Sequence, residues 1–369
     1  MVKMTKIVGL ITVAFLIAGC SSSGEETNSQ TTDSSENETV ESQETDGNTE
    51  DNGEDHVESD ANKDTEEGTS DDDDAENVDT SEETGKTNEE TGTSSDKGSD
   101  TEAYGGAQLN PTYFIDTQVI NQPDRFYIAY AIDRDRETEG MVSPEQRLET
   151  SLFNNDPTEQ DILRSYTDLT LDPPNLYVEF NQVGSELSVT SAQSGLFYET
   201  LFGISDFYGV EYITFLNPDG GQRITVAERT VDDTITVKDE RGATRGYYTI
   251  YDEELEETLF ISGGELDEKV VNESGEPLSF PETIEKMGSV EADMFYSSAI
   301  VEGIEIVNSS MTNGVATVQY TMNENAVTDA DRTVFENAIQ LAALDFHAWE
   351  VELINDTVKE IRTYPLVGQ

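Results

Sequence analysis

The chain repeats itself, and this repeat restricts its fold more than any other feature of the sequence. Residues 206–211 read DFYGVE, and residues 345–350 read DFHAWE, at a spacing of 139 residues. Upstream, residues 184–189 match residues 313–318 at a spacing of 129 residues. The two spacings differ by ten, which predicts an insertion in the second copy around residues 323–331. Two blocks in the same order indicate two copies of one unit, each large enough for its own core.

Both copies show the same order of elements. In each, a strand with alternating apolar side chains leads through a turn to a partner strand, then to a helix and two further strands. The ranges expected for the first copy are strands at 176–180, 187–189, 210–216 and 224–226 and a helix at 196–204. Those for the second copy are strands at 304–307, 315–320, 349–354 and 358–361 and a helix that begins after Thr328 and continues to Phe346.

Residues upstream complete each copy. The additional elements expected there are strands at 126–132 and 247–251 and helices at 144–153, 158–169 and 281–287. The predicted fold class is therefore α+β, with two tandem similar domains, each a small, mainly antiparallel sheet packed against helices. We place the domains at residues 105–238 and 239–369, because charged residues and glycines cluster at 232–246.

Three local signals fix element ends. Ser143 and Pro144 provide an N-cap and a first-turn proline. Asn313-Gly314 is a strong hairpin signal, because both residues tolerate positive φ. Thr328 and Asp331 have the spacing of a capping box, in which each residue satisfies a backbone N–H of the other.

The charge is strongly negative and unevenly spread. The 369 residues carry a formal net charge of −59. Residues 21–104 hold 30 Asp and Glu against three Lys with almost nothing apolar, which predicts a disordered acidic linker. The remaining residues still hold 49 acids against 15 bases. A field of that sign repels nucleic acid, so we expect no nucleic-acid partner.

The N-terminus reads as the signal peptide of a lipoprotein. Lys3 and Lys6 precede an apolar run at residues 7–18, which is too short to cross a bilayer comfortably. Small residues then lead to Cys20, the sole cysteine of the chain, in a pattern that resembles the lipobox of bacterial lipoproteins. We therefore expect residues 1–20 to be the signal peptide and Cys20 to be the lipid-attachment residue. Its acyl chains would hold the protein on the extracytoplasmic face of the cell membrane.

His347 is the one histidine outside the acidic tract, and it decides whether to look for an enzyme. The repeat pairs His347 with Tyr208, at the step from helix to strand, so we interpret it as a structural corner residue. One histidine and no second cysteine leave no Cys/His pair and no histidine-rich metal cluster. We therefore predict no catalytic residue, no cofactor and no metal ligand.

Carboxylates are the remaining candidates for catalysis, since a glycosidase needs only two acids. Glu211 and Glu350 are the two to inspect first, because both copies hold them. Their alternation with apolar neighbours in a strand indicates that they face solvent. The stretch Asp133-Arg134-Asp135-Arg136 could bind a cation, but its arginines would neutralise its aspartates. We therefore interpret the stretch as a solvated loop.

Residues 303–360, GIEIVNSSMTNGVATVQYTMNENAVTDADRTVFENAIQLAALDFHAWEVELINDTVKE, resemble the GerMN domain of spore-formation and germination lipoproteins. The similar elements are the strand, the NGVATV hairpin, the helix after a short loop, and the final strand and turn. The first copy resembles that domain less closely, because it lacks the Asn-Gly turn, and the long acidic spacer is not typical of the family. The resemblance implies an envelope protein that binds or scaffolds, and it carries over no catalytic residues. Whether the chain acts in sporulation is left open.

The sequence favours a membrane-tethered extracytoplasmic lipoprotein with tandem GerMN-like domains that binds or scaffolds an envelope partner, either protein or peptidoglycan. The alternatives are a carboxylate-dependent cell-wall hydrolase and a solute-binding lipoprotein. The last usually has larger α/β lobes with crossover strands, which the many hairpins expected here do not match.

Overall fold

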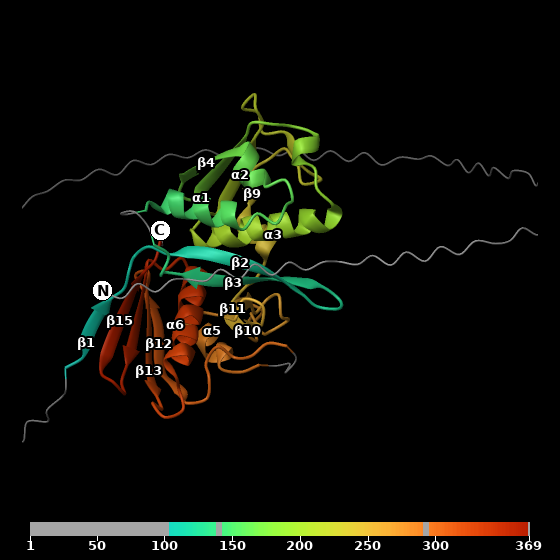
Figure 1. Cartoon of the computed structure of the whole chain (residues 1–369). Coiled ribbons are helices and arrows are strands. Elements are labelled where there is room, and N and C mark those ends of the chain that lie inside the picture. Colours follow the sequence, from blue (N-terminus) through green and yellow to red (C-terminus); the bar gives the residue numbers. More distant parts are fainter. Residues whose placement is uncertain (1–102, 138–141, 291–294, 368–369) are drawn as a thin grey trace, which may run out of the picture. The chain divides into compact units, whose positions relative to one another are not determined.

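The structure, a computed structural model, describes residues 103–137, 142–290 and 295–367 (Figure 1). The helices are α1 (Pro144–Asn154), α2 (Ile162–Tyr166), α3 (Ser191–Phe207), α4 (Val237–Arg241), α5 (Phe280–Met287) and α6 (Asp329–Leu344). The strands are β1 (Gly105–Gln108), β2 (Phe114–Asn121), β3 (Phe126–Asp133), β4 (Thr167–Asp172), β5 (Asn175–Phe180), β6 (Tyr212–Leu216), β7 (Ile224–Val226), β8 (Arg229–Val231), β9 (Ile235–Thr236), β10 (Tyr247–Asp252), β11 (Glu257–Ser262), β12 (Ile304–Thr312), β13 (Val315–Met322), β14 (Glu350–Asn355) and β15 (Glu360–Pro365).

The two copies have one plan, which confirms the α+β class with tandem similar units. Each begins with a hairpin and a helix, β2–β3 with α1 and β10–β11 with α5. A four-stranded sheet with a helix between its second and third strands follows: β4, β5, α3, β6 and β9 in the first copy, and β12, β13, α6, β14 and β15 in the second. In both sheets the central pair is parallel and its neighbours are antiparallel.

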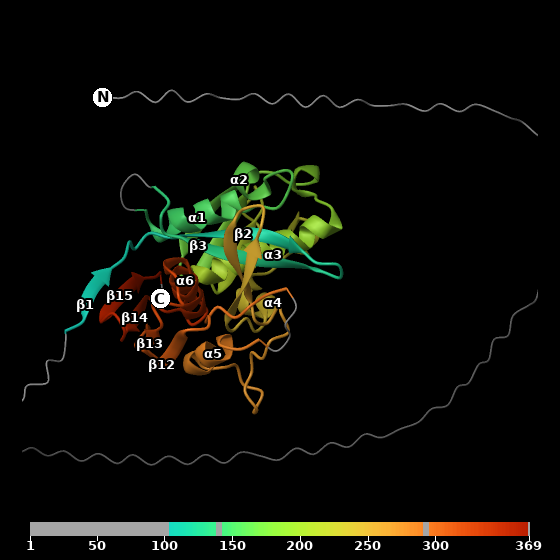
Figure 2. The same ribbon diagram turned by 60° about the horizontal axis from the view of Figure 1, so that its bottom comes forward.

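Strands of the two ranges expected as separate domains share sheets. The leading hairpins of both copies form one sheet in the order β10-β11-β3-β2, where Phe260 of β11 pairs with Tyr130 of β3. Strand β1 adds to the second copy's sheet, parallel to β15. Contacts group the described residues into one unit, and α4 spans the boundary expected between residues 238 and 239. Figure 2 shows β2 and β3 beside both α3 and α6, which contact this hairpin.

The three local signals are confirmed. Ser143 caps α1, with Pro144 in the first turn. Asn313 and Gly314 form the turn between β12 and β13 with φ values of 51° and 75°. The Thr328 hydroxyl accepts from the Asp331 backbone N–H at 3.1 Å, and the Asp331 carboxylate accepts from the Thr328 backbone N–H at 2.9 Å. Such signals succeed because they involve only neighbouring residues.

The expected hairpin partner at residues 187–189 is wrong. Gly184, at φ 89°, begins a single 3-10 turn at Ser185–Leu187, and the Leu187 carbonyl accepts from the Ala227 N–H. The antiparallel partner of β5 is β4, which precedes it in the chain. The first residues of β4 lie in the range 158–169, which was expected to be a helix. Residues 167–172 read TDLTLD and alternate in burial, as an edge strand does. The turn equivalent to Asn313-Gly314 is therefore Pro173-Pro174.

The ten-residue insertion predicted around residues 323–331 is also wrong. Asn175 and Val315 begin the equivalent strands, and Ser191 and Asp329 begin the equivalent helices. The spacing between the copies thus changes only from 140 to 138 residues. The insertion was inferred from the match of residues 184–189 to residues 313–318, and that match pairs a 3-10 turn with a hairpin.

Helices α3 and α6 pack against the shared hairpin from the two copies. Helix α3 contacts β2 and β3, and α6 contacts β3 and β10. Gly203 of α3 permits the closest approach, because a Cβ there would lie 2.1 Å from the Tyr130 hydroxyl. The C-terminal ends of both helices consequently meet near α4, where the polar cluster described next lies.

Within the described residues, no helix has the length and hydropathy that a bilayer crossing requires.

Candidate functional site: the Arg241 cluster and its cavities

His347 occupies a backbone position that favours glycine. Its φ is 53°, and the corresponding residue after α3 is Gly209, at φ 74°. The correspondence follows from backbone hydrogen bonds, because the Ala348 N–H donates to the Ala343 carbonyl as the Val210 N–H donates to the Ser205 carbonyl. The pairing of His347 with Tyr208 is therefore wrong by one residue. Histidine is among the residues that enter this region more readily than most.

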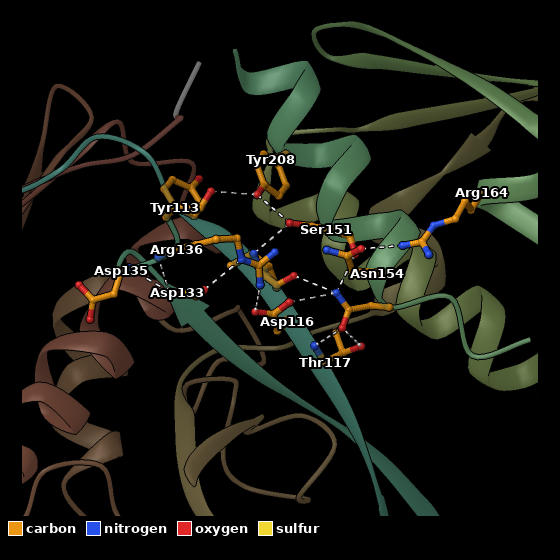
Figure 3. Close-up of polar contacts among 12 residues, drawn as sticks. Tyr113, Asp116, Thr117, Asp133, Asp135, Arg136, Ser151, Asn154, Arg164 and Tyr208 are labelled. Carbon is orange, nitrogen blue, oxygen red and sulfur yellow. Dashed lines mark hydrogen bonds and ion pairs between the residues drawn. The ribbon is translucent and has the colours of Figure 1, made fainter. Parts of the chain in front are cut away.

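Tyr208 has a different role from His347. Its ring is buried and stacks on Tyr113, with the centroids 5.6 Å apart. Its hydroxyl lies 3.0 Å from the Ser151 hydroxyl of α1, as Figure 3 shows. Burial raises the pKa of Tyr208, so the hydroxyl stays protonated. Ser151 in turn accepts from the Ile115 N–H of β2, so Tyr208 helps to attach α1 to an edge strand.

Glu211 and Glu350, which the sequence repeat pairs with each other, do not occupy equivalent positions in the two copies. The Glu211 N–H donates to the Pro174 carbonyl at 2.8 Å, and the Trp349 N–H donates to the Gly314 carbonyl at 2.9 Å. Glu211 is therefore the counterpart of Trp349, and Glu350 falls one residue further, at the start of β14. Glu211 lines the cavity described below, and Glu350 is not part of that lining.

The Asp133–Arg136 stretch is not the solvated loop that we expected. Arg136 donates to Asp116 at 2.6 Å and to Asp133 at 3.1 Å (Figure 3). Arg134 donates to Gln340 of α6 at 2.7 Å and to the Pro365 carbonyl at 2.9 Å. Burial lowers the pKa of Arg134 to about 10, which still leaves it charged at neutral pH. Arg134 joins the end of β3 to α6 and β15, and Arg136 joins it to β2, so both arginines are structural.

Arg241 is the centre of a cluster that joins the ends of α3 and α6. It lies at the C-terminus of α4, and its side chain is only 6% exposed. The guanidinium Nη1 donates to Asp206 of α3 and lies 4.0 Å from Asp345, the C-cap residue of α6. Its Nη2 is buried and has no hydrogen-bond partner. One cation thus holds a carboxylate from each copy.

Asp345 is the most buried member of this cluster, with a side chain that is 1% exposed. Its carboxylate accepts from the Tyr247 hydroxyl at 2.8 Å and from the Thr244 hydroxyl at 2.9 Å. Burial raises the pKa of Asp345 to about 6, although Arg241 and these hydroxyls favour the ionised form. Two hydroxyl donors and one cation surround the carboxylate, which is typical of a structural anion.

A cavity of about 630 Å³ opens beside this cluster. Its polar lining comes from both copies and from α4: Asp206, Glu211, Lys238, Asp239, Arg241, Arg245, Asp345 and His347. Tyr212 and Phe346 contribute aromatic surface. The His347 Nδ1 is buried and without a partner, as is the Arg241 Nη2. Four acids against three bases make this lining nearly neutral, unlike the strongly acidic region around it.

Arg241 also lines a second cavity, of about 350 Å³, which contains two acids that sequence reasoning missed. Glu199 of α3 and Glu265, which follows β11, both line it. Burial raises the pKa of Glu265 to about 7, and that of Glu199 is also raised by burial. Among 49 acids of the sequence after residue 104, neither stands in a motif, so no local signal could have found them.

No group of three or more His, Cys, Asp or Glu residues within the described ranges is placed to hold a metal ion. The predicted lipid-attachment residue, Cys20, lies outside the described residues.

The comparisons with known proteins found similarity among solved structures. No family model matches the chain, and no curated protein matches it. Among solved structures, the tandem GerMN domains of the sporulation protein GerM from Bacillus subtilis are similar to 70% of this chain and 97% of that chain. The sequence identity is 11% and the TM-score is 0.37. Values at this level establish no shared function.

Proposed function

We propose that this chain is a lipoprotein, anchored through Cys20 on the extracytoplasmic face of the cell membrane, whose tandem α+β region binds or scaffolds an envelope partner. The partner is a protein or peptidoglycan. Support for the anchor comes from the predicted signal peptide and the lipobox-like pattern before Cys20, and the acidic tract at 21–104 would carry the folded region away from the membrane.

The 630 Å³ cavity is the observation that carries the binding proposal. Its volume lies within the roughly 300–1,000 Å³ of small-molecule sites. It contains two buried polar atoms without partners, Arg241 Nη2 and His347 Nδ1, and such atoms cost free energy until a ligand or water satisfies them. Asp206 and Asp345 beside them are already engaged with Arg241 in holding the copies together, which favours binding over bond-making.

Retention on envelope material tests this proposal. The full chain, extracted from membranes in detergent, is incubated with cell-wall sacculi and with envelope extract. Tyr212→Ala, at the cavity, should weaken retention roughly fivefold or more, because an aromatic contact contributes about 1 kcal/mol or more. The matched control is Tyr251→Ala, which removes another exposed tyrosine, outside this lining. Absence of wild-type retention at both low and high salt would contradict the proposal.

Lipidation is tested separately, by labelling growing cells with a fatty acid such as palmitate. The wild-type chain should carry the label, and Cys20→Ser should abolish it and release the protein from membranes. A Cys20→Ser chain that stayed labelled and membrane-bound would show that the anchor lies elsewhere.

A wall hydrolase is the second candidate, and the Glu199 and Glu265 pair is the observation that favours it. A half-buried carboxyl whose pKa is raised to about 7, beside a second carboxyl, is the pattern of a general acid and its partner. We expect no release of reducing ends from labelled peptidoglycan. Release that Glu265→Gln abolishes would overturn the non-catalytic proposal, as would release that depends on Glu350.

A further inference from the structure

The 350 Å³ cavity has aromatic walls and charged groups, and most of those groups are already paired. Arg125 donates to Asp267 at 2.9 Å, and Arg229 donates to Glu240 at 2.6 and 3.0 Å. Phe126 of β3 is half-buried, and its ring tip lies 3.6 Å from the position of a Cβ on Gly195 of α3. Phe202 and Tyr130 close the interior.

Three groups in this cavity retain unused hydrogen-bonding capacity. Glu199 and Glu265 form no ion pair among the described residues, and Glu265 accepts from the Ser262 hydroxyl at 3.3 Å and from the Ile128 backbone N–H. Arg241, whose side chain is 94% buried, lies between the two cavities and lines both, and its Nη2 has no partner. The lining therefore contains carboxyl oxygens, which accept hydrogen bonds, and a guanidinium group, which donates them.

This combination selects the chemistry of a ligand. An anion would satisfy Arg241 but meet both carboxyls, and an amine would satisfy the carboxyls but leave Arg241 without an acceptor. A hydroxyl donates and accepts through the same oxygen, so a neutral polyol can complete all three groups. The C–H face of a pyranose ring can pack against an aromatic ring such as that of Phe126, while its hydroxyls point outward to polar groups.

We propose that the cavity formed by Glu199, Glu265, Arg241 and Phe126 binds a sugar ring of a glycan strand. The inference rests on the proposed function, because it identifies the glycan of peptidoglycan as the part of the envelope that the chain contacts. A volume of about 350 Å³ is near the lower end of small-molecule sites, which suits a short saccharide segment.

Calorimetric titration of the full chain in detergent with chitotetraose, a neutral N-acetylglucosamine oligomer, tests the site. Wild type should bind it, and Glu265→Gln and Phe126→Leu should each weaken binding roughly tenfold or more, the loss expected for one charged hydrogen bond or one stacking partner. Glu285→Gln, which removes an exposed glutamate of α5, should leave affinity unchanged. Circular dichroism establishes that each variant is folded.

The source of the ligand is resolved by two further probes. Glycan strands freed of their peptides should bind, and free stem peptides should not. Peptide binding without glycan binding overturns the inference, as does chitotetraose affinity that both Glu265→Gln and Phe126→Leu leave intact.

Failure of the site and failure of the proposed function are distinguishable. If sacculi are retained through Tyr212 but chitotetraose does not bind, the sugar site is wrong and the proposed function stands. If chitotetraose binds through Glu265 but sacculi and envelope extract are not retained, the sugar site stands and the envelope role is wrong.

Discussion

The corner after α3 and the corner after α6 have the same backbone and different side chains. Gly209 and His347 share a positive φ, and Glu211 and Trp349 make the same backbone hydrogen bond to a hairpin turn. Trp349 is half-exposed and lies over Gly314, whereas Glu211 borders the larger cavity. The comparison teaches that duplication kept the path of the chain, while the chemistry at each position diverged.

Arg241 belongs to neither corner and joins both. Because one guanidinium neutralises a carboxylate from each copy, removal of this cation should have the largest effect on the free energy of unfolding. Smaller effects follow for the buried acid beside it, for the two positive-φ residues and for the two glutamates.

Arg241→Met should lower the free energy of unfolding by about 3–5 kcal/mol, because it leaves Asp345 buried without its cation. Urea denaturation of the full chain measures the change. The control is Arg229→Met, which breaks a partly exposed pair with Glu240 and should cost about 1 kcal/mol or less. Equal effects of the two substitutions would show that the two corners hold together without Arg241.

Stability should fall as pH rises through about 7. The folded state keeps a proton on Glu265 up to its raised pKa of about 7, whereas the unfolded chain loses it near its ordinary value of 4.5. The folded state therefore binds more protons between these values, and the stabilisation present below pH 4.5 is lost above about 7. The loss over the whole range should be about 3 kcal/mol, and about 1 kcal/mol of it should fall between pH 6 and pH 8.

Unfolding in urea at pH 6 and pH 8 measures this loss. Glu265→Gln should flatten the fall between these pH values, and the remaining slope should come from Asp345, whose pKa of about 6 has the same sign. A fall that is unchanged in Glu265→Gln would assign the pH dependence to other groups.

The shared positive φ predicts opposite effects of exchange at the two corners. Gly209→Ala should cost about 1 kcal/mol, because a Cβ is strained in the left-handed region. His347→Gly should stabilise by about 0.5 kcal/mol or less, since relief of strain is offset by the greater freedom of glycine when unfolded. Thermal melts of the two variants measure both signs. A stabilising Gly209→Ala would break the correspondence of Gly209 with His347.

Glu211→Gln and Glu350→Gln should have the smallest effects, within about 0.5 kcal/mol for each. Neither carboxylate forms an ion pair among the described residues. Denaturant midpoints of both variants should coincide with wild type. A loss of more than 1 kcal/mol at one of them would identify a contact that distinguishes the copies.

The element signals that succeeded act between near neighbours. The Thr328 capping box and the Asn313-Gly314 turn are confirmed because each depends on residues no more than three apart. The register of the repeat was wrong because DFYGVE and DFHAWE align best with no gap, whereas the backbone places His347 opposite Gly209. A sequence match compares residue types, whereas the two copies share a pattern of backbone hydrogen bonds.

The candidate site was harder to predict. Arg241, Asp206 and Asp345 are far apart in sequence and meet only because α3, α4 and α6 end at the same place. Glu265 is one acid among many. Its pKa is raised by burial in a cavity that residues of β3 and α3 also line, and no local pattern in the sequence indicates that burial.

The sequence by itself determined that the chain holds two α+β copies behind an acidic tract, and where many of the helices and turns begin, because these depend on local hydrogen bonds and on the period of apolar residues. The tertiary structure alone decided that β3 pairs with β11, that one arginine joins both helix ends, and which acids are buried. Those outcomes depend on desolvation and on contacts between residues distant in the sequence, and such contacts leave no periodic trace in the sequence.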